Sequence, residues 1–280
     1  MPETSPLKTE LPAPFLFSQS SLQDYDECAR RFQLRYIEQL RWPAIETAPV
    51  LENERRQVEG QQFHRMLQQY LLSLPADTLT RMANTENLGR WWENFIKSDL
   101  ANLGKQQDAN LYPELTLSAP IGRHRIMAKY DLIALKPGAA TIFDWKTYHK
   151  RPQDAWMSAR LQTKVYRALL IVAGSHLNAR QPFAPQQVEM VYWYADFPGE
   201  PAKFPYTEAQ HQRDWNSLNI LVNEISAKQS FPMTSDEKKC AFCPYRSYCE
   251  RGIQAGEGDE LEAEISVMDV TLEQIQEIEF

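Results

Sequence analysis

The chain has 280 residues, a mass of 32.5 kDa and 43% hydrophobic residues, which is enough apolar content for one large globular domain. It contains no run of about 18 apolar residues, and its first ten residues lack the basic and then apolar pattern of a secretory signal, so we expect a cytoplasmic protein with no membrane partner. The formal charge is -7, but residues 257–280 hold nine acidic and no basic residues, leaving 28 acidic against 30 basic residues elsewhere. The rest of the chain is therefore slightly basic and could carry a local phosphate-binding surface. The acidic segment 257–280 could equally be a solvated tail that only aids solubility.

The first hundred residues have helical periodicity. We predict helices over residues 18–40, 53–73 and 86–103, with serines available to cap the first one and a loop around Pro75 between the second and third. The aromatic pair Trp91 and Trp92 is expected in the core.

After Pro113 the periodicity becomes that of extended chain. Turn residues at 120–122 and 137–139 divide residues 114–147 into three expected consecutive strands. A helix over 154–174, a strand over 186–195 and a helix over 207–228 follow, and the aromatic residues at 192–194 are expected in the core. Together these elements predict an α/β protein with a cysteine-rich end.

Charged residues interrupt two of the apolar strands. Asp131 lies in the middle of "MAKYDLIAL", and Asp144 and Lys146 lie at the end of "TIFDWKT". Each acid alone could be satisfied by a salt bridge to Lys129 or Lys146, because a buried unpaired carboxylate is costly. Together, on adjacent strands, the two acids suit Mg²⁺ or Mn²⁺. Asp144 and Lys146 are two residues apart, so their side chains share one face of the strand.

The order Asp131, then Asp144-Trp145-Lys146, resembles the D...(D/E)xK motif of the PD-(D/E)XK nuclease superfamily. It is most similar to the RecB-type branch, which includes the CRISPR-associated RecB-like exonucleases and the nuclease domains of AddAB-type helicase-nucleases. The resemblance implies a restriction-endonuclease-like core, a mixed central sheet flanked by helices. It also implies that Asp131, Asp144 and Lys146 are catalytic.

Further residues match this branch on both sides of the strands. His64, in "GQQFHR", lies where the branch has a metal-binding histidine, and Gln162 and Tyr166 match its QxxxY motif on one helix face. Glu114 occupies the place of a further acidic residue. The implied metal ligands are His64, Asp131 and Asp144, with the backbone carbonyl of Trp145 as a further candidate, and Glu114, Gln162 and Tyr166 join the implied catalytic set.

The four cysteines are Cys28, Cys240, Cys243 and Cys249, and the last three have C-x2-C-x5-C spacing. A disulfide framework does not suit a chain of this size without an export signal, so a metal centre is expected, and spacing alone does not separate a 4Fe-4S cluster from Zn²⁺. The arrangement is similar to the iron-sulfur staple of the RecB-like exonucleases and AddB-type subunits, which implies a 4Fe-4S cluster. Ala29 departs from the proline that commonly follows the first cysteine.

The resemblance gives a domain layout and a reaction. It divides the chain into an N-terminal tail (1–14), a RecB-type nuclease domain (15–253) and an acidic C-terminal tail (254–280). Within the domain it places a helical region (15–110), a catalytic core (111–230) and a cysteine cluster (240–249). The implied reaction is hydrolysis of single-stranded DNA or DNA ends with Mg²⁺ or Mn²⁺, in repair or CRISPR adaptation.

Two other classes of function stay open at this point. The chain could be an inactive DNA-binding or assembly subunit of a helicase-nuclease complex, although the complete set of Asp131, Asp144 and Lys146 argues against it. It could also be a zinc-stapled scaffold. No Walker A sequence is visible, so any unwinding would come from a partner, either a helicase or CRISPR adaptation proteins.

Overall fold

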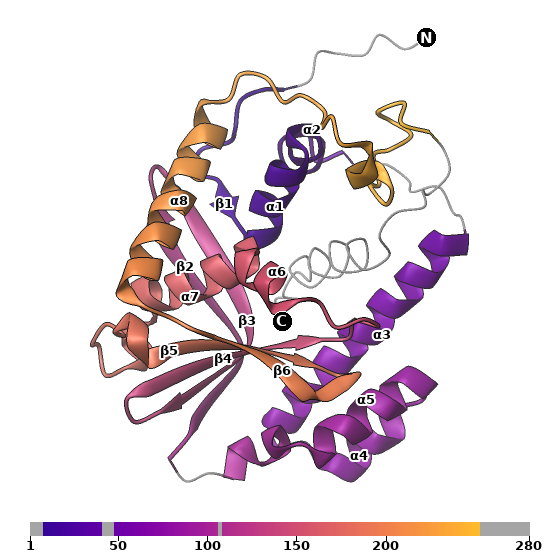
Figure 1. Ribbon diagram of the computed structural model, residues 1–280, viewed down its shortest axis with the longest axis vertical. Coiled ribbons are helices and arrows are strands. Elements are labelled where there is room, and N and C mark those ends of the chain that lie inside the picture. Colours follow the sequence, from indigo (N-terminus) through magenta and orange to yellow (C-terminus); the bar gives the residue numbers. More distant parts are fainter. Residues whose placement is uncertain (1–7, 41–47, 106–107, 253–280) are drawn as a thin grey trace.

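A mixed β-sheet forms the centre of the protein in the computed structural model, which describes residues 8–40, 48–105 and 108–252 (Figure 1). Within these residues six strands join one sheet: β1 (Leu16–Phe17), β2 (Asn110–Ile121), β3 (His124–Lys136), β4 (Ala139–Lys146), β5 (Val188–Tyr194) and β6 (Phe197–Pro205). The acidic tail predicted over 254–280 lies outside the described residues.

The long strand β3 organises the sheet. It pairs antiparallel with β2 along one edge, and on its other edge with β1 near one end and with β4 near the other. β4 then pairs parallel with β5, which pairs antiparallel with β6. The three consecutive strands predicted from the sequence are confirmed as β2, β3 and β4, joined by turns at Gly122 and Gly138, both with positive φ.

Helices cover both faces of this sheet (Figure 1). They are α1 (Gln19–Glu27), α2 (Ala29–Phe32), α3 (Ala48–Leu71), α4 (Ala76–Met82), α5 (Glu86–Lys97), α6 (Asp154–Ala159), α7 (Leu161–Ala173) and α8 (Glu208–Ala227), with short 3-10 segments and a π turn at Gln33–Ile37. None of the helices in the described part of the chain is both long and apolar enough to span a bilayer. The architecture is the predicted α/β class with a central mixed sheet flanked by helices.

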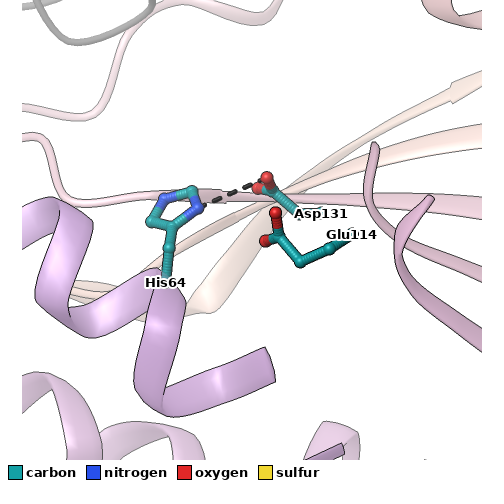
Figure 2. A group of neighbouring side chains, drawn as sticks. All are labelled: His64, Glu114 and Asp131. Carbon is teal, nitrogen blue, oxygen red and sulfur yellow. Dashed lines mark ion pairs between the residues drawn. The ribbon is translucent and has the colours of Figure 1, made fainter. Parts of the chain in front are cut away.

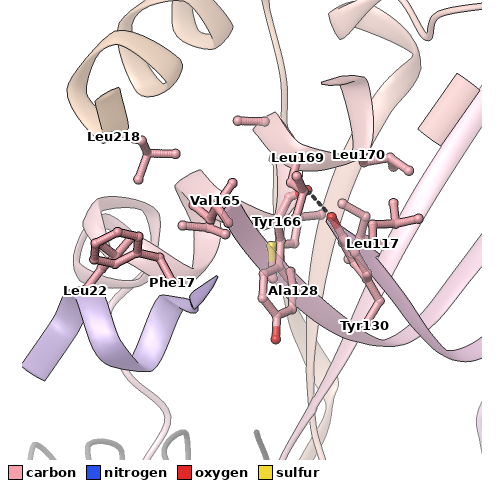
Figure 3. Packing of buried hydrophobic residues seen from close by; sticks show 14 of the residues in the cluster. Phe17, Leu22, Leu117, Ala128, Tyr130, Val165, Tyr166, Leu169, Leu170 and Leu218 are labelled. Carbon is pink, nitrogen blue, oxygen red and sulfur yellow. Dashed lines mark hydrogen bonds between the residues drawn. The ribbon is translucent and has the colours of Figure 1, made fainter. Parts of the chain in front are cut away.

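Each face of the sheet has its own hydrophobic core. On one face Leu22 of α1, Val165 and Leu169 of α7 and Leu218 of α8 pack with Phe17 of β1 (Figure 3). On the other face Phe63 of α3 and Phe95 of α5 pack against Trp145 and Trp193 of the sheet. The aromatic residues at 91, 92 and 192–194 are buried in these cores, as predicted.

Several elements differ from the prediction. The helix expected over 18–40 is interrupted at Cys28, whose backbone is extended, and the one expected over 154–174 is interrupted at Arg160 in the same way. The loop expected around Pro75 contains the short helix α4, which buries Leu79. Strands β1 and β6 were not predicted, since β1 has two residues and β6 includes Pro198 and Pro201.

Candidate active site

An irregularity in two paired strands creates the first part of the site. The β2–β3 ladder runs from Asn110 to Pro113 and resumes at Leu115, and the interrupted positions are Glu114 and Asp131, which lie opposite each other. Glu114 has φ of 54°, in the left-handed region that non-glycine residues adopt at a cost. Such irregularities re-aim side chains and are frequent at functional sites.

The same irregularity changes which face of β3 points to which core. Tyr130 packs in the core under α7, whereas Leu132, two residues later, packs in the core under α3 and α5. Regular alternation would place both residues on one face. The reversal at Asp131 turns its carboxylate toward α3 instead of into either core.

Helix α3 supplies the partner of this carboxylate. His64 Nδ1 lies 3.3 Å from Asp131 Oδ1, and the nearest ligand atoms of His64, Glu114 and Asp131 all lie within 4.8 Å of one another (Figure 2). The other oxygen, Asp131 Oδ2, accepts a hydrogen bond from the backbone amide of Trp145 at 2.8 Å. Glu114 Oε2 also pairs with Lys129 Nζ at 2.9 Å. We call His64, Glu114 and Asp131 the acidic cluster.

The charges in the acidic cluster favour a cation. Burial raises the pKa of Glu114, and the nearby Asp131 carboxylate raises it further, against the opposing effects of Lys129 and His64. Burial lowers the pKa of His64, but Asp131, Glu114 and Asp144 outweigh burial and raise it overall. The two converging, partly buried carboxylates are oxygen donors that suit Mg²⁺ or Mn²⁺, with the His64 imidazole as a nitrogen donor beside them, so the residues present can hold such a metal.

A second group of side chains lies at the end of β4. Lys146 Nζ is 3.0 Å from Asp144 Oδ2 and donates to Gln162 Oε1 at 3.0 Å, while Gln162 Nε2 donates to Asp144 Oδ1 at 2.7 Å. The residues are almost fully buried, with exposed fractions of 2%, 3% and 4% for Asp144, Lys146 and Gln162. The predicted shared face of Asp144 and Lys146 is confirmed. The interruption of the helix at Arg160 places Gln162 in the first turn of α7.

The two groups are neighbours but are not one ligand set. The charge of Asp144 contributes to the raised pKa of His64, so the two groups interact electrostatically. Among the described residues, however, the group of three ligand atoms within 4.8 Å does not include Asp144. A role for Asp144 as a metal ligand stays a prediction, as does that of the Trp145 carbonyl, whose peptide is held beside the cluster through its amide.

Tyr166 lies on α7 one turn after Gln162 and bonds to β3. Its hydroxyl donates to the backbone carbonyl of Lys129 at 2.9 Å, and its ring lies 4.9 Å from that of Tyr130, which donates to the Tyr166 carbonyl (Figure 3). Through these contacts Tyr166 ties α7 to β3 just before Asp131. Its side chain therefore supports the strand that carries the acidic cluster.

Sequence reasoning missed Tyr192 at this site and the actual partner of Lys129. Lys129 is the ion-pair partner of Glu114, and Tyr192 of β5 is the cross-strand partner of Asp144 and contacts Gln162. Lys129 was considered only as a partner for the strand acids. Nothing in the sequence around Tyr192 distinguishes it from its aromatic neighbours, because its role depends on the parallel pairing of β4 and β5.

The four cysteines come together from opposite ends of the described chain. Burial raises the pKa of Cys240 and Cys249, and the nearby Cys28 raises both further. Burial also raises the pKa of Cys243 to about 11, although the Arg31 guanidinium opposes it. Arg31 is itself held at 2.7 Å from Asp24 in α1. Four partly exposed thiols brought together beside a fixed cation are surroundings that suit a metal centre better than ordinary core cysteines.

Four cysteine thiols are a donor set that suits either a tetrahedral Zn²⁺ or a 4Fe-4S cluster.

Comparison with known proteins gives one match along the sequence and several in structure. A family model described as the PD-(D/E)XK nuclease superfamily matches residues 16–250. The crystal structure of SSO0001 has 14% sequence identity and a TM-score of 0.40, over 86% of this chain and 89% of that one. A candidate exonuclease from Eubacterium rectale has 10% identity and a TM-score of 0.44, over 74% of this chain and 79% of that one. No curated protein matches the chain.

Proposed function

Because the chain belongs to the PD-(D/E)XK nuclease superfamily, we propose that it is a Mg²⁺- or Mn²⁺-dependent deoxyribonuclease of the RecB type. The observation that carries this proposal is the acidic cluster, in which His64 joins two carboxylates beside the Asp144 and Lys146 pair. His64 lies in the helical region before the strands, where the RecB-type branch resembled by this chain carries a metal-binding histidine.

His64, Glu114 and Asp131 would hold the divalent metal, and Asp144 and the Trp145 carbonyl stay predicted as further ligands. When bound, such a metal lowers the pKa of a coordinated water and neutralises charge on a phosphodiester. The structural support is electrostatic: without a cation the charged carboxylates of the acidic cluster are unfavourable, since burial and the Asp131 carboxylate both disfavour the ionised form of Glu114. The amide of Trp145 fixes the orientation of Asp131 by its hydrogen bond to Oδ2.

Lys146 supplies the positive charge of the proposed site. Its ammonium is held at 3.0 Å from both Asp144 and Gln162, so it is oriented before a substrate arrives. A preorganised cation stabilises negative charge that develops on a phosphate more effectively than a mobile one. Gln162 orients both partners, since its amide nitrogen donates to Asp144 and its oxygen accepts from Lys146.

A 4Fe-4S cluster held by Cys28, Cys240, Cys243 and Cys249 is the second part of the proposal. It is supported by the convergence of the four thiols and by the buried Arg31 next to Cys243. Such a cluster would bind the segment after α8 to the N-terminal helices. Closing a loop of more than 200 residues restricts the unfolded chain, which stabilises the fold.

The substrate and the pathway follow the RecB-type resemblance. We expect hydrolysis of single-stranded DNA or of duplex ends, in repair or in the capture of CRISPR spacers. A helicase or the CRISPR adaptation proteins are the corresponding partners.

Degradation of end-labelled single-stranded DNA by anaerobically purified protein tests the proposal. Asp131→Asn, Asp144→Asn and Lys146→Met should each lower the rate at least 100-fold with Mg²⁺ or Mn²⁺, because each removes a charge that the reaction uses. Asp196→Asn is a matched control: its carboxylate is 13% exposed, compared with 14% for Asp131, and pairs with Arg90 outside the site. This control should keep wild-type activity.

The outcomes separate the competing functions. Cleavage by wild type and by Asp196→Asn, lost in the three site variants with the cluster absorbance retained, supports the nuclease mechanism. Wild-type protein that degrades neither DNA nor RNA with either metal would contradict it and favour an inactive subunit. A colourless anaerobic preparation that contains zinc would overturn the iron-sulfur part alone.

A further inference from the structure

The ammonium group of Lys146 is enclosed by aromatic rings as well as by polar groups. Lys146 Nζ lies 5.6 Å from the ring centre of Tyr148 and 5.4 Å from that of Tyr192, in addition to its contacts with Asp144 and Gln162. Both distances are within the range of cation–π attraction. Both tyrosines are fully buried, so water does not compete at the ring faces.

Tyr192 also contacts the residue that orients Lys146. Its hydroxyl lies 2.8 Å from Thr163 Oγ1 and donates to Gln162 Oε1 at 3.4 Å. Thr163 Oγ1 already donates its only proton to the carbonyl of Met157 at 2.6 Å. The single proton of the Tyr192 hydroxyl is therefore shared between two acceptors, Thr163 Oγ1 at 2.8 Å and, more weakly, Gln162 Oε1 at 3.4 Å.

Charge fixes the amide orientation of Gln162. An ammonium can only donate and a carboxylate can only accept, so Oε1 must face Lys146 and Nε2 must face Asp144. In this orientation Oε1 also accepts the weaker share of the Tyr192 hydroxyl proton. Tyr192 is the cross-strand partner of Asp144, so the register of β4 and β5 determines its position.

We propose that Tyr192 is a positioning residue of the active site: its ring borders the Lys146 ammonium, and its hydroxyl holds Gln162 in the orientation that aligns Lys146 with Asp144. The inference rests on the proposed nuclease function. It extends the active site to β5, which carries none of the motif residues. A phenylalanine would fill the core equally well, and the buried hydroxyl would be costly without its partners at the site.

A double-mutant cycle tests the route through Gln162. Tyr192→Phe keeps the ring and should lower the single-turnover cleavage rate about 5-fold, the effect of losing one hydrogen bond. Tyr192→Leu removes the ring as well and should lower it about 50-fold. In a Gln162→Leu background, Tyr192→Phe should have no further effect, because its hydroxyl acts through Gln162. Additive effects of the two substitutions would overturn the proposal.

A measurement that does not depend on cleavage separates this proposal from the proposed function. The ¹H–¹⁵N NMR signal of the Lys146 ammonium, assigned by its absence in Lys146→Met, should be visible in wild type because the group is shielded from water. It should broaden in Tyr192→Leu and remain in Tyr70→Phe, a control that removes one hydroxyl bonded to the Ala101 carbonyl.

Each combination of results has one meaning. An inactive wild type in which Tyr192→Leu broadens the signal contradicts the nuclease function and leaves the placement of Lys146 by Tyr192 supported. An active wild type in which Tyr192→Leu changes neither the rate nor the signal overturns the role of Tyr192. Circular dichroism and melting curves would confirm that all variants fold.

Discussion

The left-handed backbone of Glu114 gives a prediction whose sign can be worked out from the structure. Glu114→Ala and Glu114→Gly both remove the carboxylate and its ion pair with Lys129. They differ only in how well each residue tolerates φ of 54°. The difference between the two variants therefore isolates the conformational cost at this position.

The two contributions to this difference have opposite signs. A residue with a Cβ pays roughly 1–2 kcal/mol to adopt the left-handed conformation. Glycine loses about 0.5–1 kcal/mol more backbone entropy on folding. We therefore expect Glu114→Gly to be more stable than Glu114→Ala by about 0.75 kcal/mol in the free energy of unfolding, within a range of about 0–1.5 kcal/mol, and neither variant to cleave DNA normally.

Urea denaturation without added Mg²⁺ or Mn²⁺ measures this difference. Thr116, an exposed residue of the same strand that pairs in register with Lys129, is the matched control. There the glycine variant should be less stable than the alanine variant by about 0.5–1 kcal/mol, because no left-handed strain is relieved. A Glu114→Gly variant that is equal to or less stable than Glu114→Ala would refute the reasoning that the strand is strained to aim this carboxylate.

Three further results are expected. Mn²⁺ at a hundredfold excess over its dissociation constant should stabilise the wild type by about 2.7 kcal/mol in thermal unfolding, and an undiminished shift in Asp131→Asn would contradict the ligand assignment. Cys28→Ala should lower both the cluster absorbance and the melting temperature under anaerobic conditions, whereas unchanged absorbance would exclude Cys28 as a ligand. Burial lowers the pKa of His124, the nearby Arg123 lowers it further, and the Nδ1 atom of His124 accepts a hydrogen bond from the Phe15 amide. The free energy of unfolding should therefore fall as the pH drops through about 6.5, and it should fall less in His124→Gln.

Much of strand β4 was predictable because its signals are local. Residues two apart in a strand share a face whatever surrounds them, so the pairing of Asp144 with Lys146 followed from spacing alone. The turns at Gly122 and Gly138 likewise indicated their strands. The joining of Asp131 to His64 and Glu114 was implied only by family resemblance, because regular alternation gives the wrong face at Asp131.

A signal for this irregularity was present but not used. Pro113 lies within β2, directly before Glu114, and a proline inside a strand often marks a bulge. The interruptions at Cys28 and Arg160 have no such marker, since neither proline nor glycine adjoins them and the apolar spacing continues through both. At the first interruption a tertiary contact is visible: the amide of Arg30, just after Cys28, donates a hydrogen bond to the Pro232 carbonyl.

The cysteine set and the active site are physically connected through two helices. Phe231, which precedes the cysteine triplet, stacks on Phe32 at 6.1 Å and meets Tyr25 of α1 at 6.4 Å. α1 in turn packs against α7, the helix that carries Gln162 (Figure 3). Loss of the proposed cluster should therefore loosen α1 on α7 and disturb the orientation of Lys146 without any electron transfer. Reduced cleavage by cluster-free protein is then expected from structure alone and does not by itself indicate a redox role.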